Sequence, residues 1–306
     1  MISSIPSTRP AERPSALSDH GKLWKSYYVR INGLKTRFIS AGEGEPLVLL
    51  HGSAPGASAE TNFHMNIAAL AEHFRVYGLD QVGYGRTEAP AGADVLGDEQ
   101  RRVDHLLGFL DTLCLDRVHL MGQSMGSATA ARFVCDRPDR VSKIVFVNLG
   151  GAQLGVSGTS EYRPTHEANV RALAENPNRE TMRAVLRGLM HREDSITDDL
   201  VDARLEMALL PGALDAHRNR GLATKRSDDF EQRNDLRTRL PRLSHPMIVL
   251  WGKQDKNMVI EVGYQVRDML PNLRGFYEFD NAGHHVQTDQ HEAFNARVIE
   301  FLRSTD

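Results

Sequence analysis

The 306-residue sequence has very few cysteines, almost no net charge and no long hydrophobic run, and each shortage excludes a class of protein. Its two cysteines, Cys114 and Cys135, are too few for a disulfide framework or a thiolate metal site. The 37 Lys and Arg residues against 40 Asp and Glu residues give a formal net charge of −3, so no nucleic-acid or membrane partner is expected. The longest strongly apolar stretches have five or six residues, whereas a transmembrane helix needs about 20.

The N-terminal segment 1–24 is rich in Ser, Pro, Arg and Ala and contains no apolar run that could serve as the core of a signal peptide. We expect this segment to be a flexible lead-in, poorly ordered over Met1–Asp19. In the absence of a targeting signal, we predict a cytoplasmic protein in which both thiols are reduced and buried.

Strand and helix patterns alternate along most of the chain, which is typical of a largely parallel sheet with helices on both faces. Asn32-Gly33 lies between two strand-like runs and predicts a hairpin at the start of the sheet. The predicted strands are Lys25–Ile31, Leu34–Ser40, Pro46–His51, Arg75–Asp80, Val118–Gly122, Lys143–Asn148, Met247–Gly252 and Gly275–Asp280. Apolar residues at helical spacing predict helices near residues 65–74, 98–114, 125–135, 259–270 and 294–302. The fold class is therefore α/β.

Between about Gly151 and Asp229 this alternation stops. The segment lacks apolar strand runs and carries two helical stripes, one around Met182–Leu189 and the other around Val201–Leu209. We interpret it as a helical cap, residues 151–229, inserted into a core formed by residues 25–150 and 230–306.

The sharpest motif is Gly122-Gln123-Ser124-Met125-Gly126, directly after a predicted strand and directly before a predicted helix. This is the context that a nucleophile elbow requires. Glycines at both ends allow a sharp turn and close packing of the helix on the strand, and the helix N-terminus favours negative charge at the serine. We therefore predict that Ser124 is a nucleophile.

A serine nucleophile needs a base and an orienting acid, which in this kind of fold follow the serine in the order Asp, His. Asp255 comes just after strand Met247–Gly252, and His284 comes just after the last predicted strand. Asp280 and Asp80 are competing acids, because each ends a strand. We prefer Asp255, since Asp280 is too close to His284 in sequence, and we interpret Asp80 as a turn former.

The glycine-containing loop after strand Pro46–His51 is placed to supply an oxyanion hole. One backbone N–H would come from Ser53, with Ala54 as the alternative, and the other from Met125, directly after the nucleophile. The loop is equally compatible with a plain connection between strand and helix.

Four segments resemble the α/β-hydrolase family, and in particular its meta-cleavage-product branch, the carbon–carbon bond hydrolases of bacterial aromatic degradation. They are HGSAPGASAETN (51–62), GQSMG (122–126), WGKQDK (251–256) and GHHVQTDQHEAFN (283–295). The resemblance covers nearly the whole chain after Trp24 and implies the α/β-hydrolase fold, with Ser124, Asp255 and His284 as the catalytic triad.

The resemblance also implies residues that bind the substrate. Asn62 matches an asparagine near the polar end of the substrate, and Arg204 matches an arginine of the lid motif that binds a carboxylate. The chain departs from the branch at Gln123, where the branch usually has Asn, and at His285, where it usually has Trp. Both positions line the branch's pocket.

The implied reaction is hydrolysis of a C–C bond in a vinylogous diketone that carries a carboxylate. Hydrolysis of an ester or a lactone is the alternative for the same residues, and a catalytically idle ligand-binding protein is a third possibility. No metal or organic cofactor is expected. The expected partners are a small-molecule substrate and other copies of the chain, in a homodimer or a higher homo-oligomer.

Overall fold

A computed structural model of the chain describes residues 23–90, 98–150, 154–156, 158, 160–214 and 235–305. The lead-in predicted over 1–24 lies outside these residues except for Leu23 and Trp24. The predicted boundaries of the cap, at 150/151 and 229/230, also fall at or within segments that are not described, so this division of the chain stays a prediction.

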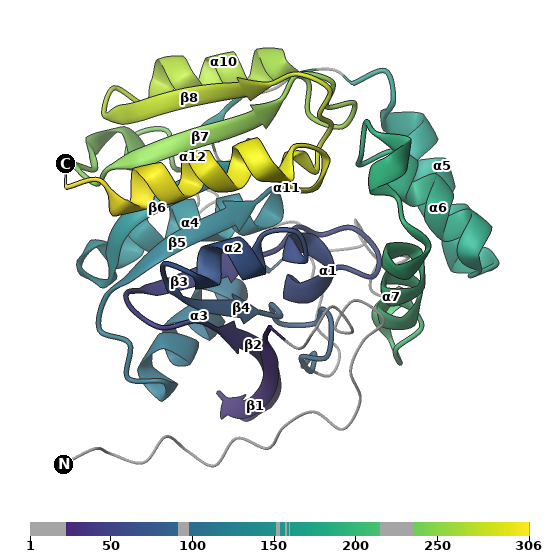
Figure 1. Cartoon of the computed structure of the whole chain (residues 1–306), viewed down its shortest axis with the longest axis horizontal. Helices are drawn as coiled ribbons and strands as arrows, with labels where there is room; N and C mark the ends of the chain where they lie inside the picture. Colours follow the sequence, from purple (N-terminus) through teal and green to yellow (C-terminus); the bar gives the residue numbers. More distant parts are fainter. Residues whose placement is uncertain are drawn as a thin grey trace.

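An eight-stranded sheet forms the centre of the molecule, in the order β1-β2-β4-β3-β5-β6-β7-β8 (Figure 1). The first two strands form the predicted antiparallel hairpin, in which Asn32 and Gly33 both have positive φ, at 49° and 84°. β2 also pairs antiparallel with β4, and all the remaining pairs are parallel. The strands are β1 (Lys25–Ile31), β2 (Leu34–Ala41), β3 (Pro46–Leu50), β4 (Arg75–Leu79), β5 (Val118–Gln123), β6 (Val141–Val147), β7 (Met247–Gly252) and β8 (Leu273–Phe279).

Each face of the sheet is covered by helices, because successive side chains of the buried strands point to opposite sides. In β3, Val48 and Leu50 belong to one hydrophobic cluster, whereas Leu47 and Leu49 belong to the other. The first cluster is completed by α3 (Glu99–Thr112), α4 (Met125–Asp136) and α10 (Ile260–Met269). The second is completed by α1 (Ala59–Phe63), α2 (Ile67–Ala71) and α12 (His291–Arg303). This arrangement confirms the predicted fold class.

Three helices between β6 and β7 have a hydrophobic cluster of their own: α5 (Arg163–Glu175), α6 (Arg179–Arg187) and α7 (Asp198–Ala208). Figure 1 shows them together beyond the carboxyl ends of the strands. Asn178 caps α6 and Thr197 caps α7, each by accepting hydrogen bonds from backbone N–H groups of the first turn. α6 and α7 therefore begin at residues that cap them, and the three helices lie over the edge of the sheet where the parallel strands end.

Two sequence predictions are wrong. Cys114 is exposed and Cys135 only half-buried, because α3 ends at Thr112 and Cys114 then adopts a positive φ of 53°, which turns its side chain off the buried helix face. The helix expected over 65–74 is shortened to α2 and is preceded by the unpredicted α1. Ser58 and Thr61 start α1 with a capping box, in which threonine takes the place of the usual Glu or Gln.

A buried ionic cluster connects the hairpin to α1 and to the residue that follows β4. Arg37 donates to Asp80 at 3.2 Å and to Glu60 at 2.6 Å, and all three side chains are almost fully buried. Although burial lowers the pKa of Arg37, the two carboxylates raise it above its ordinary value. Asp80 also accepts from the backbone N–H groups of Ala59 and Arg86. Asp80 is therefore more than the turn former predicted, because it anchors the start of α1.

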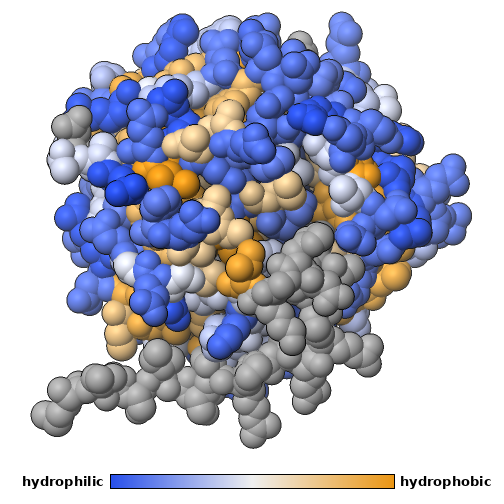
Figure 2. Space-filling model, viewed as in Figure 1, coloured by the Kyte–Doolittle hydropathy of each residue, from blue (hydrophilic) through white to orange (hydrophobic). Residues whose placement is uncertain are grey.

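The surface in Figure 2 is mostly hydrophilic, with small apolar patches. Among the described residues only Leu23, Met65 and Leu209 are large, hydrophobic and exposed. None of the helices in this part of the chain is long and apolar enough to cross a membrane.

Buried neutral histidines make the stability of the fold dependent on pH. His105 on α3 shares a 2.8 Å hydrogen bond with Thr36, and burial lowers its pKa to about 4. Unfolded His105 has a pKa of about 6.5, so the unfolded chain binds a proton that the folded chain does not as the pH falls from 6.5 towards 4. We therefore expect His105 to cost the fold about 2 kcal/mol of stability between pH 7 and pH 5.

Urea unfolding at these two pH values tests this expectation with the variant His105→Gln, whose amide can still bond to Thr36. The wild type is expected to lose about 2 kcal/mol more between pH 7 and pH 5 than the variant does. Equal losses in the two proteins would show that His105 is not held neutral by the fold.

Candidate active site

Ser124 lies in a strained turn between β5 and α4, with φ 51° and ψ −114°. A Cβ atom built on Gly122 would lie 2.4 Å from the carbonyl carbon of Gly126, and one built on Gly126 would lie 2.0 Å from the carbonyl oxygen of Leu50. Only glycine fits at either position. The backbone of α4 therefore approaches the ends of β3 and β5 closely, and Ser124 is held at the edge of the sheet in the geometry of a nucleophile elbow.

His284 and Asp255 are joined in the way the sequence predicts. Nδ1 of His284 lies 2.6 Å from Oδ2 of Asp255, and both side chains are buried. The other oxygen of Asp255, Oδ1, accepts from the backbone N–H groups of Asn257 and Met258, at 2.8 and 2.9 Å. These bonds fix the carboxylate, which in turn orients the imidazole so that its Nε2 atom is left for another partner.

Asn148 also binds the Asp255 carboxylate, a contact that sequence reasoning missed. Its Nδ2 donates to Oδ2 of Asp255 at 2.8 Å, so this oxygen receives both Asn148 and His284. Asn148 directly follows β6 and has φ 51°, a conformation that asparagine tolerates better than most residues. A polar residue at the end of the strand between β5 and β7 was the available signal, since the carboxyl ends of parallel strands meet at one edge.

The competing acids take other roles. Asp280 lies on the surface, where it pairs with Lys253 at 2.8 Å, and Asp80 belongs to the buried cluster with Arg37. Neither is bonded to His284 by the described contacts, whereas Asp255 is.

Four of the predicted substrate-binding and site residues form one buried chain of hydrogen bonds. Arg204 on α7 donates to Oδ1 of Asn62 at 2.8 Å, Nδ2 of Asn62 donates to Oε1 of Gln123 at 3.1 Å, and Nε2 of Gln123 donates to the carbonyl oxygen of His284 at 3.1 Å. These hydrogen bonds link α7 to the loop that carries His284 through Gln123, the residue just before Ser124.

Arg204 is fully buried without a carboxylate partner among the described residues. Among the described residues its only other hydrogen bond, besides the one to Asn62, is a 3.5 Å contact with the carbonyl of Pro55. Its Nε atom has no partner there. Burial lowers the pKa of Arg204 to about 9. A guanidinium buried in this way carries a desolvation cost that a bound anion would offset.

His285 is also buried, and burial, with a contribution from nearby Arg204, lowers its pKa well below the ordinary value. It is therefore neutral near pH 7. Its backbone N–H donates to the carbonyl of Leu189, and Nδ1 has no partner among the described residues. The ring can accept or donate one further hydrogen bond from the position where it borders the cavity.

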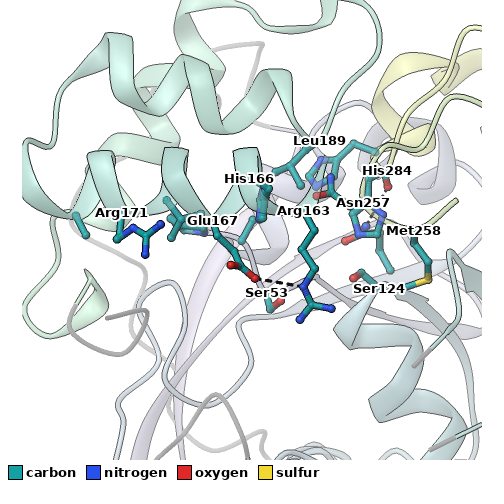
Figure 3. Close-up of a pocket in the computed structure, with 16 residues that line it drawn as sticks. Ser53, Ser124, Arg163, His166, Glu167, Arg171, Leu189, Asn257, Met258 and His284 are labelled. Atoms are coloured by element: carbon teal, nitrogen blue, oxygen red, sulfur yellow. Dashed lines mark hydrogen bonds and ion pairs between the residues drawn. The ribbon is translucent and has the colours of Figure 1, made fainter. Parts of the chain in front are cut away.

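Several of these residues line one cavity of about 790 Å³, shown in Figure 3. Its walls include Ser124, His284, Gln123, His285 and Ser53. The described residues that line it do not include Asn62 or Arg204, which lie behind the wall through their bonds to Gln123 and Pro55. The remaining lining residues are Ala54, Pro55, Arg163, His166, Glu167, Val170, Arg171, Ala174, Leu189, Asn257 and Met258.

The two backbone N–H groups predicted for an oxyanion hole stand in suitable places. Ser53 lines the cavity from the loop that follows β3, the strand next to β5 in the sheet. Met125 is the first residue of α4, where a backbone N–H has no acceptor within the helix. Their role in stabilising an oxyanion stays a prediction.

Hydrogen bonds to Asp289 hold the segment after α6 against the loop that carries His284. The buried carboxylate of Asp289 accepts from the backbone N–H groups of His191 and Gly283, both at 2.8 Å, and from that of Arg192 at 3.3 Å. The side chain of Asn257, two residues after Asp255, donates to the carbonyl of Gly188. The cap and both loops that carry the His–Asp pair are therefore connected through short backbone contacts.

Comparison with known proteins agrees with this geometry. The family described as alpha/beta hydrolase fold matches residues 45–290. The chain is 34% identical over 293 residues to a 2-hydroxy-6-oxononadienedioate/2-hydroxy-6-oxononatrienedioate hydrolase of Burkholderia vietnamiensis, covering 93% of this chain and 98% of the relative. It is 28% identical over 274 residues to a 2-hydroxy-6-oxo-6-phenylhexa-2,4-dienoate hydrolase of Comamonas testosteroni, covering 87% and 90%.

A similar fold occurs in a solved structure of a meta-cleavage product hydrolase from Pseudomonas fluorescens. The TM-score is 0.75 at 24% sequence identity, over 91% of this chain and 98% of the other. The similarity therefore extends over the sheet, its covering helices and the segment between β6 and β7.

Loss of the Asn148 side chain is expected to weaken the hold on Asp255 and so slow the reaction of Ser124 with a fluorophosphonate. A hydrogen bond to a charged group contributes about 1.5–3 kcal/mol, so Asn148→Ala should slow labelling by about tenfold or more. Asn281→Ala is the matched control, since Asn281 has a similar φ of 54° but an exposed side chain. Equal labelling rates in the two variants would contradict the role of Asn148.

Proposed function

This chain is an enzyme that belongs to the α/β-hydrolase fold family, and we propose that it hydrolyses a carbon–carbon bond in a vinylogous diketone that carries a carboxylate. The relatives named above act on 2-hydroxy-6-oxo compounds of this kind. The observation that carries the proposal is the buried Arg204, a cation with no anion among the described residues, beside the cavity that holds Ser124 and His284.

Ser124, His284 and Asp255 supply the reacting groups in this proposal. Asp255 holds the imidazole through Nδ1, which leaves Nε2 to take a proton from Ser124 or from a water molecule and to return it later. As His284 becomes positively charged, the buried carboxylate stabilises it. The backbone N–H groups of Ser53 and Met125 stabilise the negative charge that forms on the attacked carbonyl oxygen.

The substrate's carboxylate would bind the guanidinium of Arg204. Its Nε atom lacks a partner, and the 3.5 Å contact of Nη1 with the Pro55 carbonyl is the weaker of its two bonds, so both nitrogens can turn to a carboxylate. Arginine presents such nitrogens as a fork that matches a planar carboxylate. Asn62 keeps the other terminal nitrogen in place and connects the bound anion to Gln123.

The proposed chemistry begins with a proton moving to the carbon next to the 6-oxo group, which converts the dienol to the keto form. Oxygen from water or Ser124 then adds to the 6-carbonyl carbon. The adjacent C–C bond breaks, and its electron pair moves through the conjugated carbons to the oxygen beside the carboxylate. After water has been consumed, the products are a carboxylic acid and a hydroxydienoate, so one water molecule is added across the broken bond.

The same residues could hydrolyse an ester or a lactone, the alternative that the sequence leaves open. The buried Arg204 favours a substrate with a carboxylate, which a simple ester does not offer. A cytoplasmic location and a homo-oligomeric assembly, expected from the sequence, remain part of the proposal.

Purified wild-type enzyme is expected to bleach the yellow colour of a 2-hydroxy-6-oxo-2,4-dienoate, because cleavage shortens the conjugated system. Ser124→Ala should slow this bleaching by at least 10³-fold, as removal of a nucleophile does in other serine hydrolases. Absorbance decay under steady-state conditions measures both. If the wild type turns over p-nitrophenyl esters but never bleaches the dienoate, the C–C assignment is wrong and the esterase alternative holds.

Arg204→Ala is expected to raise KM for carboxylate-bearing dienoates by about tenfold or more, because one charge-assisted contact is lost. Hydrolysis of a neutral p-nitrophenyl ester by the same variant should change little, and this comparison controls for damage to the site through Asn62. Equal losses for both substrates would remove the carboxylate-binding role.

A further inference from the structure

The backbone around His284 is held by hydrogen bonds on both sides of the histidine. The N–H group of Gly283 donates to Oδ2 of Asp289 at 2.8 Å, and the N–H group of His285 donates to the carbonyl of Leu189 at 2.9 Å. A Cβ atom built on Gly283 would lie 2.9 Å from the carbonyl oxygen of Leu189, so the two backbones are in direct contact. The position of the imidazole therefore depends on these partners.

Both bonds lead to one segment, residues 188–192, which follows α6 and is called the connecting segment below. Oδ2 of Asp289 also accepts from the backbone N–H group of His191 at 2.8 Å, and Oδ1 accepts from that of Arg192 at 3.3 Å. The Asp289 carboxylate thus lies between the connecting segment and the residue before His284. It bonds to the backbone of both.

The connecting segment also supports the acid of the site. Nδ2 of Asn257 donates to the carbonyl of Gly188, and the backbone N–H group of Asn257 donates to Oδ1 of Asp255 at 2.8 Å. Leu189, Asn257 and His284 all line the cavity (Figure 3). One short segment therefore contacts the loops of both partners in the 2.6 Å bond between His284 and Asp255.

A carboxylate suits position 289 because both of its oxygens are used. Asp289 is 1% exposed, and its oxygens accept three backbone N–H groups from two parts of the chain. An amide has only one acceptor oxygen and would turn its own NH₂ group towards a donor. Among the described residues, the N–H groups of Gly283 and His191 have no other acceptor, and a buried N–H group without a partner is unfavourable.

We propose that Asp289 is a positioning residue, which keeps the imidazole of His284 in its working position by connecting the loop around it to the connecting segment. The inference rests on the proposed role of His284 as the base, and it does not depend on which bond of the substrate is cleaved. Asp289 is not among the described residues that line the cavity, so its effect on the reaction passes through His284.

The rate at which a fluorophosphonate labels Ser124 tests this role, because the reaction needs the base but no particular substrate. Asp289→Asn is expected to slow labelling by about tenfold or more, since a hydrogen bond to a charged group is lost beside His284. Asp194→Asn is the matched control. Asp194 lies two residues after the connecting segment and pairs with Arg192 on the surface, and its replacement should leave the labelling rate unchanged.

A double-mutant cycle separates positioning from a general loss of structure. In a His284→Ala background, Asp289→Asn should have almost no further effect on labelling, because the group that it positions is gone. Equal slowing in both backgrounds would overturn the inference, and so would labelling of Asp289→Asn at the wild-type rate. Urea unfolding shows whether each variant is folded. If Asp289→Asn does not fold, Asp289→Glu takes its place in the cycle, and the same outcomes decide.

Failure of this inference can be told apart from failure of the proposed function. If the wild type is labelled at Ser124 but bleaches no dienoate, the C–C assignment fails, and the cycle still decides the role of Asp289. If the wild type is not labelled at all, the proposed roles of Ser124 and His284 fail and this inference fails with them.

Discussion

The site depends on one close contact between backbones, where the first turn of α4 lies against the carbonyl of Leu50 at the end of β3. The contact is closer than any side chain allows, since a Cβ atom on Gly126 would lie 2.0 Å from that oxygen. The turn that brings the helix so close leaves Ser124 at φ 51°, a conformation that costs of order 1–3 kcal/mol for a residue other than glycine. The buried central strands β3, β5 and β6 hold the turn in this conformation, so the stability of the sheet is used to expose one hydroxyl.

Two buried charged side chains of the site, Asp255 and Arg204, differ in how fully their hydrogen-bonding atoms are paired within the protein. The Asp255 carboxylate accepts four hydrogen bonds, from His284, Asn148 and two backbone N–H groups, and is complete within the protein. The Arg204 guanidinium has only Asn62 and a long contact with Pro55. The unsatisfied guanidinium supports the proposal that Arg204 binds an anionic ligand. Hydrogen bonds through Asn62 and Gln123 connect Arg204 to the carbonyl oxygen of His284, so in the proposed function the substrate's carboxylate is linked to the proposed base.

Much of this architecture could be predicted from the sequence, because it depends on local signals. Asn32-Gly33 sets the hairpin, buried apolar runs set the central strands, and the glycines around Ser124 set the elbow. The pairing of His284 with Asp255 follows from two residues at neighbouring strand ends. To predict these features it is enough to know the order of the residues along the chain and the period of the hydrophobic pattern.

The features that could not be predicted depend on tertiary contacts. Asn148 binds Asp255, which is far away in the sequence, and its place at the end of β6 marks only the edge of the sheet and not this partner. Asp289 accepts from the backbone N–H groups of His191 and Arg192, and nothing in its own neighbourhood in the sequence marks this. Arg204 resembles a solvated helix residue, and it is buried only because α7 packs with Asn62 and Pro55 on its inner side. Cys114 is exposed because α3 ends two residues earlier than its apolar pattern does.

The most direct measurement of the central claim is mass spectrometry of the products formed from a 2-hydroxy-6-oxo-dienoate in water enriched in ¹⁸O. The account predicts two shorter acids, with one ¹⁸O atom in the carboxylate made from the former 6-oxo carbon. A product that keeps the carbon skeleton of the substrate intact would contradict it.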